Sequence, residues 1–123
     1  MESKLMKEIP ISGSTVVGIT AGYAINIALS NGGGISIEDP VRIVSGAGIV
    51  AVDPSSGSPD VSPIEKGILD RRVEGASCGD DYTLSVLLDN GVALIVAPNK
   101  DGYESWSVSV PPDYYIVGNA EFS

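Results

Sequence analysis

The sequence predicts an all-β protein in which two tandem antiparallel β units form one sandwich or barrel-like domain, with one short helix between the units. Three observations favour this fold class. One strand pattern occurs twice, apolar and polar residues alternate within both copies, and Gly, Pro and Asn separate the alternating runs. The length of 123 residues is typical of a single domain, so we expect residues 1–123 to fold as one.

Two ten-residue segments carry the repeat. Residues 23–32 read YAINIALSNG, and residues 82–91, which lie 59 positions later, read YTLSVLLDNG. Every second residue from each tyrosine is apolar, a period that places these side chains on one face of a strand. We expect these residues to line one shared core: Tyr23, Ile25, Ile27 and Leu29 with Tyr82, Leu84, Val86 and Leu88.

The repeat units span about residues 11–53 and 68–118, and together they predict about eight short strands. Each unit centres on a hairpin that turns at an Asn-Gly pair, because both residues tolerate the positive φ of tight turns. The further strands are expected at Val41–Val44, Ile49–Val52, Glu104–Val110 and Tyr114–Val117.

Residues 54–70 join the two units. The stretch Asp53–Pro63 is rich in Ser, Pro, Gly and Asp, which indicates a surface linker. The sequence Ser62-Pro63-Ile64-Glu65 has the pattern of a capping box with Pro at the first helical position. A short helix from Pro63 to about Asp70 is therefore expected.

The composition excludes several functions. A formal net charge of -9 with only 7 Lys and Arg residues argues against nucleic acid as a ligand. The chain has no histidine, which removes Ser-His-Asp and Cys-His catalysis and the commonest metal ligand. The acidic clusters lack the spacing of a cation site, and Gly32-Gly33-Gly34 leads into no helix, unlike a phosphate loop. We expect no catalytic residues, no metal and no cofactor.

Cysteine content and the lack of long apolar segments indicate a compartment. Cys78 is the only cysteine, so no disulfide framework is present, as is usual in a reducing cytosol. Its repeat partner is Ala21, which favours a small buried residue over a reactive thiol. No export signal and no apolar stretch of about 18 residues occurs. We therefore expect a cytoplasmic protein that does not cross a membrane.

The segment Tyr103-Glu104-Ser105-Trp106 has no counterpart in the first unit. Trp106 is in phase with Val108, so its ring either fills the core or belongs to a contact surface. Specialisation is expected where the two copies differ. We predict that a partner binds the acidic and aromatic surface around Asp101, Tyr103 and Glu104.

Three motifs together resemble an uncharacterised family of small bacterial proteins. They are a G-x-x-x-G segment before a strand that begins with Tyr, an NG turn, and a closing Tyr-Glu-Ser-Trp strand, over roughly Gly18–Pro40 and Gly75–Val117. Related small acidic proteins are similar to immunity proteins of polymorphic toxin systems. The first unit departs from the pattern through its Gly-Gly-Gly turn and its missing Tyr-Glu-Ser-Trp segment, and the resemblance implies no catalytic residue.

The leading hypothesis is a non-enzymatic cytosolic interaction protein, and specifically an immunity protein that binds and inhibits a toxin or another protein partner. A charge of -9 would steer a toxin with a basic surface toward it. The alternative is a small-molecule binding module whose ligand lies between the repeat units or at a homodimer interface. A small ligand should raise the melting temperature in the second case, and only a protein partner in the first.

Overall fold

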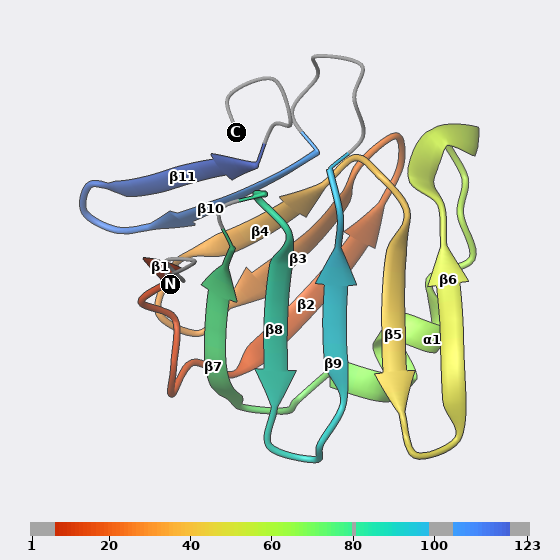
Figure 1. The fold of residues 1–123 in the computed structure, drawn as a ribbon, viewed down its shortest axis with the longest axis horizontal. Coiled ribbons are helices and arrows are strands. Elements are labelled where there is room, and N and C mark those ends of the chain that lie inside the picture. The colour runs from red at the N-terminus through yellow and green to blue at the C-terminus, as the bar shows by residue number, and fades with distance from the viewer. Residues whose placement is uncertain (1–6, 80, 99–104, 119–123) are drawn as a thin grey trace.

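The protein is a β-sandwich of two antiparallel sheets, with six and five strands, that face one another (Figure 1). The computed structural model describes residues 7–79, 81–98 and 105–118. The predicted all-β class is confirmed, and the open edges make the fold a sandwich and not a barrel. The part of the chain described contains eleven strands instead of about eight. The three additional strands are β1, β2 and β7.

The strand order is β1-β7-β8-β9-β5-β6 in the larger sheet and β11-β10-β4-β3-β2 in the smaller. The strands of the larger sheet are β1 (Lys7–Glu8), β7 (Val73–Cys78), β8 (Leu84–Leu88), β9 (Ala93–Val96), β5 (Val41–Ser45) and β6 (Gly48–Val52). Those of the smaller sheet are β11 (Tyr114–Gly118), β10 (Trp106–Val110), β4 (Gly34–Ile37), β3 (Ile25–Leu29) and β2 (Val16–Ala21).

The two repeats exchange their last hairpins. Strands β2-β3-β4 of the first repeat and β7-β8-β9 of the second each form a three-stranded meander in a separate sheet. The following hairpin then crosses to the other sheet, so that β5 pairs with β9 and β10 pairs with β4. Both meanders carry a register shift at the same place, Val16/Gly18 and Val73/Gly75. Each sheet therefore contains strands from both repeats.

The predicted core is confirmed except for the two tyrosines. The six aliphatic side chains of the alternating segments lie in one buried cluster: Ile25, Ile27, Leu29, Leu84, Val86 and Leu88. The prediction for Tyr23 was wrong, because this side chain is 77% exposed. Tyr82 is half-buried and has a positive φ of 62°. Both tyrosines precede the strands that begin at Ile25 and Leu84, so the strand alternation does not reach them.

Trp106 belongs to the core and not to a contact surface. Its side chain is 1% exposed, and its ring lies directly against the backbone of Gly118 on β11. The indole Nε1 donates a hydrogen bond of 2.7 Å to the carbonyl oxygen of Tyr82. Because Trp106 lies in the smaller sheet and Tyr82 lies two residues before β8 of the larger sheet, this bond joins the two layers.

The linker forms a 3₁₀ turn at Pro54–Ser56 and one helix, α1, at Ser62–Ile68. The predicted capping box was wrong, since Val61 occupies the N-cap without a side-chain hydrogen bond. Asp60 Oδ1 instead accepts hydrogen bonds from the backbone N–H and the hydroxyl of Ser62. The helix buries Ile64 and Ile68 and packs against β5. Within the residues described, no helix has the length and apolar character needed to cross a membrane.

Candidate functional site

The residues predicted to bind a partner, Asp101, Tyr103 and Glu104, lie outside the described residues. Trp106, from the same segment, is buried in the core. Each of the two sheets also has an outer face, on the side away from the other sheet (Figure 1). Each is built from register rows, because directly paired residues of neighbouring strands share a face.

The outer face of the five-stranded sheet carries small and uncharged polar side chains. One register row contains Thr20, Asn26, Ser36, Ser107 and Val117. The adjacent row contains Gly18, Ala28, Gly34, Ser109 and Tyr115. The strands therefore present hydroxyl and amide groups beside a row of residues that, except for Tyr115, have little or no side chain.

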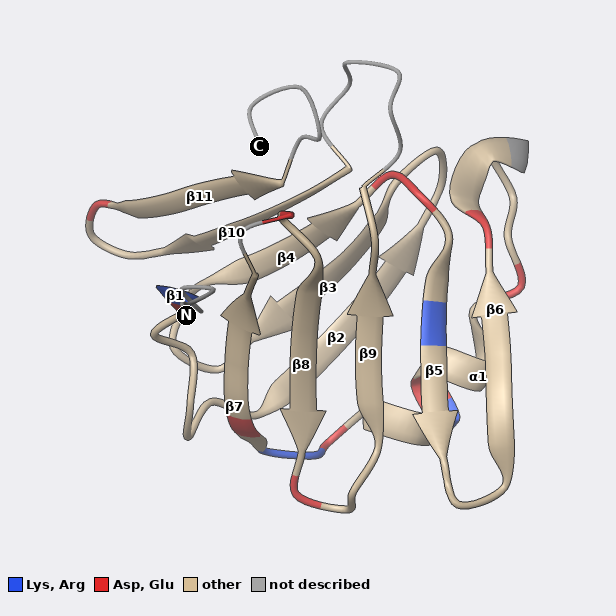
Figure 2. Ribbon diagram, in the orientation of Figure 1, with Lys and Arg blue, Asp and Glu red and all other residues tan. Residues whose placement is uncertain are grey.

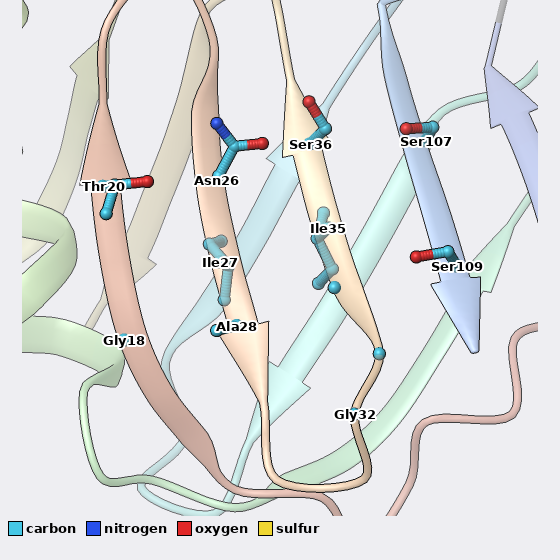
Figure 3. A pocket seen from close by; sticks show the side chains of 12 residues that line it. Gly18, Thr20, Asn26, Ile27, Ala28, Gly32, Ile35, Ser36, Ser107 and Ser109 are labelled. Atoms are coloured by element: carbon cyan, nitrogen blue, oxygen red, sulfur yellow. The ribbon is translucent and has the colours of Figure 1, made fainter. Parts of the chain in front are cut away.

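These two rows form a hollow of about 380 Å³ over β2, β3, β4 and β10, which we call the polar hollow (Figure 3). Its floor includes the backbone around Gly18, Ala28 and Gly34. Gly33 also lines it, and a Cβ there would collide with the carbonyl oxygen of Ser109. Glycine at this position therefore lets the β3–β4 turn approach β10 closely.

Five side chains in the polar hollow have hydrogen-bonding groups: Thr20, Asn26, Ser36, Ser107 and Ser109. Figure 3 shows them on four adjacent strands. None of these side chains forms a hydrogen bond with another described residue. Hydroxyl and amide groups both donate and accept, and the residues of the described segments that line the hollow include no ionisable side chain. The chemistry of this surface therefore suits a neutral ligand with its own donors and acceptors.

The outer face of the six-stranded sheet is apolar. One register row, which we call the apolar strip, contains Gly75, Leu87, Ala93, Val44 and Ile49. Leu87 is 44% and Ile49 65% exposed. The adjacent row contains Ser77, Ser85, Ile95, Arg42 and Ala51. Arg42, on β5, is the charged residue in these rows, and Figure 2 shows a blue segment on this strand.

The two outer faces are built from equivalent positions of the two repeats. Ala28 corresponds to Leu87 and Ser36 to Ile95, 59 residues later in each case. The exchanged hairpins also supply equivalent positions. Ser109 pairs with Gly34 on one face, and Val44 pairs with Ala93 on the other. The two faces therefore differ in their side chains and not in their strand pairing. Small residues leave a hollow on the outer face of the five-stranded sheet. At the equivalent positions of the six-stranded sheet, larger apolar residues cover the surface.

A second hollow, of about 570 Å³, lies between α1 and the β5–β6 hairpin. Its apolar lining includes Ile43, Val50 and Val92, and its charged lining consists of Asp60 and Lys66. Two hydrogen bonds from Ser62, followed by weaker attraction from Lys66, hold the pKa of Asp60 below its usual range. Asp60 is thus an ionised carboxylate that organises the start of α1, and it lacks the raised pKa of a general acid.

Cys78 is buried on β7, as its repeat partner predicted. Burial raises the pKa of its thiol, with a smaller opposing effect from Lys7. A thiol with a raised pKa is a poor nucleophile at neutral pH. Among the residues that the structure describes, no group of three or more His, Cys, Asp or Glu side chains could hold a metal ion.

Neither outer face was predicted as a site from the sequence. The outward-facing positions of the repeat could have indicated these two faces, because they differ between the copies. Ala28 in the first copy corresponds to Leu87 in the second, and Ser36 corresponds to Ile95. The inward positions, which match, revealed the repeat and the core. Comparing the positions that do not match would have separated a polar face from an apolar one.

Fold and surfaces together define a duplicated β-sandwich with two chemically different faces. The chain belongs to a family of unknown function, DUF6188, whose sequence profile matches residues 7–121. This match confirms the expected relation to an uncharacterised family. Comparison with curated proteins and with solved structures found no match.

Proposed function

We propose that this protein is a non-enzymatic interaction protein that binds a protein partner through the outer face of its six-stranded sheet. The observation that supports this best is the apolar strip, which crosses five strands and leaves Leu87 and Ile49 exposed. Contiguous exposed apolar surface on a soluble domain is typical of protein contacts. The strand bodies of β8, β9 and β6 carry no charged residue that would oppose burial.

The charge distribution around the apolar strip indicates the chemistry of the partner. Arg42 lies between Ile95 and Ala51 in its row, so a partner that covers it must offer a carboxylate or carbonyl oxygen. Carboxylates lie at the ends of the strands: Glu38 precedes β5 and Asp53 follows β6. Figure 2 shows red segments at this end of the sheet. An apolar centre with a charged rim is typical of protein interfaces.

The other end of the strands carries mixed charge. Glu74 follows Arg71 and Arg72 in the chain, and the backbone N–H of Asp89 donates a hydrogen bond of 2.9 Å to the carbonyl oxygen of Arg72. Figure 2 shows both red and blue segments at this end. The acidic excess of this face is therefore greatest at the end with Glu38. The partner that fits has an apolar centre and a basic periphery on that side, and the net charge of -9 would speed its approach.

Inhibition of the partner is the specific function that we propose. An immunity protein acts by covering its toxin, which requires a large contact face and no catalytic group. The lack of histidine and the resemblance to immunity proteins of bacterial toxin systems support this proposal. The cytoplasm, where such a protein would meet its toxin, is the compartment we expect.

Co-purification from the source organism, followed by mass spectrometry, should identify the partner. The affinity of the purified pair is then measured for the wild type, Leu87→Lys and Ile49→Lys. We expect each change to weaken binding by about 10-fold or more, since buried anchors of an interface are costly to replace. The activity of the partner should also fall when all of the partner is bound by this protein.

A matched control comes from the repeat. Tyr115 occupies the position equivalent to Ile49 on the opposite face and is 60% exposed. Tyr115→Lys should therefore leave the affinity for the partner unchanged. If Leu87→Lys and Ile49→Lys bind like the wild type, the apolar strip is not the interface. A partner that stays fully active in the saturated complex would contradict the inhibitory role.

A further inference from the structure

The polar hollow lies on the opposite side of the sandwich from the apolar strip and plays no part in the interface proposed above. Its volume of about 380 Å³ lies within the range of small-molecule sites, roughly 300–1,000 Å³. The strands that line it come from both repeats, because β10 enters the first sheet through the hairpin exchange. Equivalent positions on the other face carry larger apolar side chains such as Leu87 and Ile95.

The hydrogen-bonding groups of the polar hollow are arranged in a line. Thr20, Asn26, Ser36 and Ser107 are register partners on β2, β3, β4 and β10. Adjacent strands are about 4.8 Å apart, so the line extends for roughly 14 Å. A ligand that satisfies these groups has donors and acceptors repeated along its length. The hydroxyl groups of a short oligosaccharide meet this requirement.

The ligand must also be neutral. Among the described residues, no Asp, Glu, Lys or Arg lines the polar hollow, so a charged group bound there would lose water without gaining an opposite charge from them. The net charge of -9 further disfavours an anion. These two observations separate a neutral sugar from sugar acids and phosphorylated sugars.

Tyr115 supplies an aromatic surface next to these groups. It is the register partner of Ser109, at the end of the row of small residues, and 60% of its side chain is exposed. Aromatic rings combine a large apolar face with little conformational freedom, which suits contact with the C–H face of a sugar ring. An aromatic residue beside several polar groups is the usual composition of a site that orients its ligand.

We infer that the polar hollow binds a neutral oligosaccharide. The line from Thr20 to Ser107 would hydrogen-bond its hydroxyl groups, and Tyr115 would pack against one ring. Gly18, Ala28 and Gly34 would let the ligand approach the sheet closely, since they present little side chain above the backbone. The polar hollow can bind its ligand whether or not a protein partner covers the outer face of the other sheet.

The test uses the full chain and four tetrasaccharides. Maltotetraose, cellotetraose and xylotetraose are neutral, and tetragalacturonate is the charged comparison. Titration calorimetry and ¹H–¹⁵N NMR should show that at least one neutral sugar binds with a Kd of about 1 mM or below. The shifted amides should belong to β2, β3, β4 and β10, and tetragalacturonate should bind at least about 10-fold more weakly.

Two substitutions transfer side chains from the other face into the polar hollow. Ala28→Leu and Ser36→Ile introduce the residues that the second repeat has at positions 87 and 95. The equivalent strands of that repeat already carry these side chains, so the substitutions should be compatible with the fold. Each should weaken sugar binding by about 10-fold or more at an unchanged melting temperature. Val17→Leu, which enlarges by one carbon a 55% exposed side chain of β2 that does not line the hollow, should bind like the wild type.

Several results would overturn the inference. One is that none of the three neutral sugars binds at about 10 mM, a concentration at which even weak complexes form. The others are amide shifts confined to strands outside the polar hollow, wild-type affinity in both filled variants, or equal affinity for tetragalacturonate.

Discussion

Replacing Trp106 should show how far the contact between the two sheets depends on one side chain. The ring is buried, and its Nε1 donates to the Tyr82 carbonyl at 2.7 Å. Trp106→Ala removes the ring and the hydrogen bond, a change that costs about 3–5 kcal/mol at a fully buried aromatic. Trp106→Phe keeps much of the apolar contact but leaves the Tyr82 carbonyl without this donor, which costs about 1–3 kcal/mol.

Urea denaturation followed by far-UV circular dichroism measures both costs. At an m-value of roughly 2 kcal/mol/M, Trp106→Ala should lower the midpoint by about 1.5–2.5 M and Trp106→Phe by about 0.5–1.5 M. Val17→Ala, at a 55% exposed position, is the control and should change stability by less than about 0.5 kcal/mol. If Trp106→Ala costs no more than Val17→Ala, the ring does not hold the sheets together. Equal costs for Ala and Phe would mean that ring packing contributes nothing beyond the hydrogen bond.

Three further predictions concern single residues. Gly118→Ala places a Cβ against the Trp106 indole and should destabilise the fold by about 1–3 kcal/mol in a thermal melt, whereas Gly22→Ala, which meets no atom within 4 Å, should not. The buried Cys78 thiol, with its raised pKa, should react with Ellman's reagent at pH 8 far more slowly in the native protein than in urea, and equal rates would show that it is accessible. Because the Ser62 hydrogen bonds lower the folded-state pKa of Asp60, its contribution to stability is complete above the unfolded pKa of about 3.9 and is lost as pH falls through the folded pKa. Asp60→Asn should therefore lose stability relative to the wild type near neutral pH, with a difference that shrinks in acid, and a difference independent of pH would contradict this cause.

The sequence predicted the core well because strand alternation is a local property. Ile25, Ile27 and Leu29 are buried wherever β3 pairs, provided that one face of its sheet is covered. Strands β2 and β7 were missed because a bulge interrupts the alternation in each, at Val16/Gly18 and Val73/Gly75. An extra residue in one strand moves the following side chains out of phase, so the period of two is lost where the strand begins.

The hairpin exchange could not be predicted, because alternation does not specify the partner of a strand. Val41 and Ile43 would be buried equally well whether β5 paired with β4 or with β9. The pairing of β5 with β9 depends on contacts between residues about 50 positions apart, such as Ile43 with Leu94. The register rows of both outer faces depend on the exchanged pairings. The polar hollow and the apolar strip therefore could not be predicted from the sequence.

Duplication within one chain explains how two different surfaces can arise from one repeated unit. A two-fold dimer of identical units would carry the same side chains on both outer faces, because symmetry imposes them. Two copies within one chain are free of this constraint at outward positions, whereas the inward positions of both still pack into one core. Ser107 and Ser109 of the second repeat thus complete a polar hollow that begins on the first, while Arg42 and Val44 of the first complete the apolar face of the second. A substitution in either repeat can therefore change one face without changing the other, which is the condition for one small sandwich to recognise two unlike ligands.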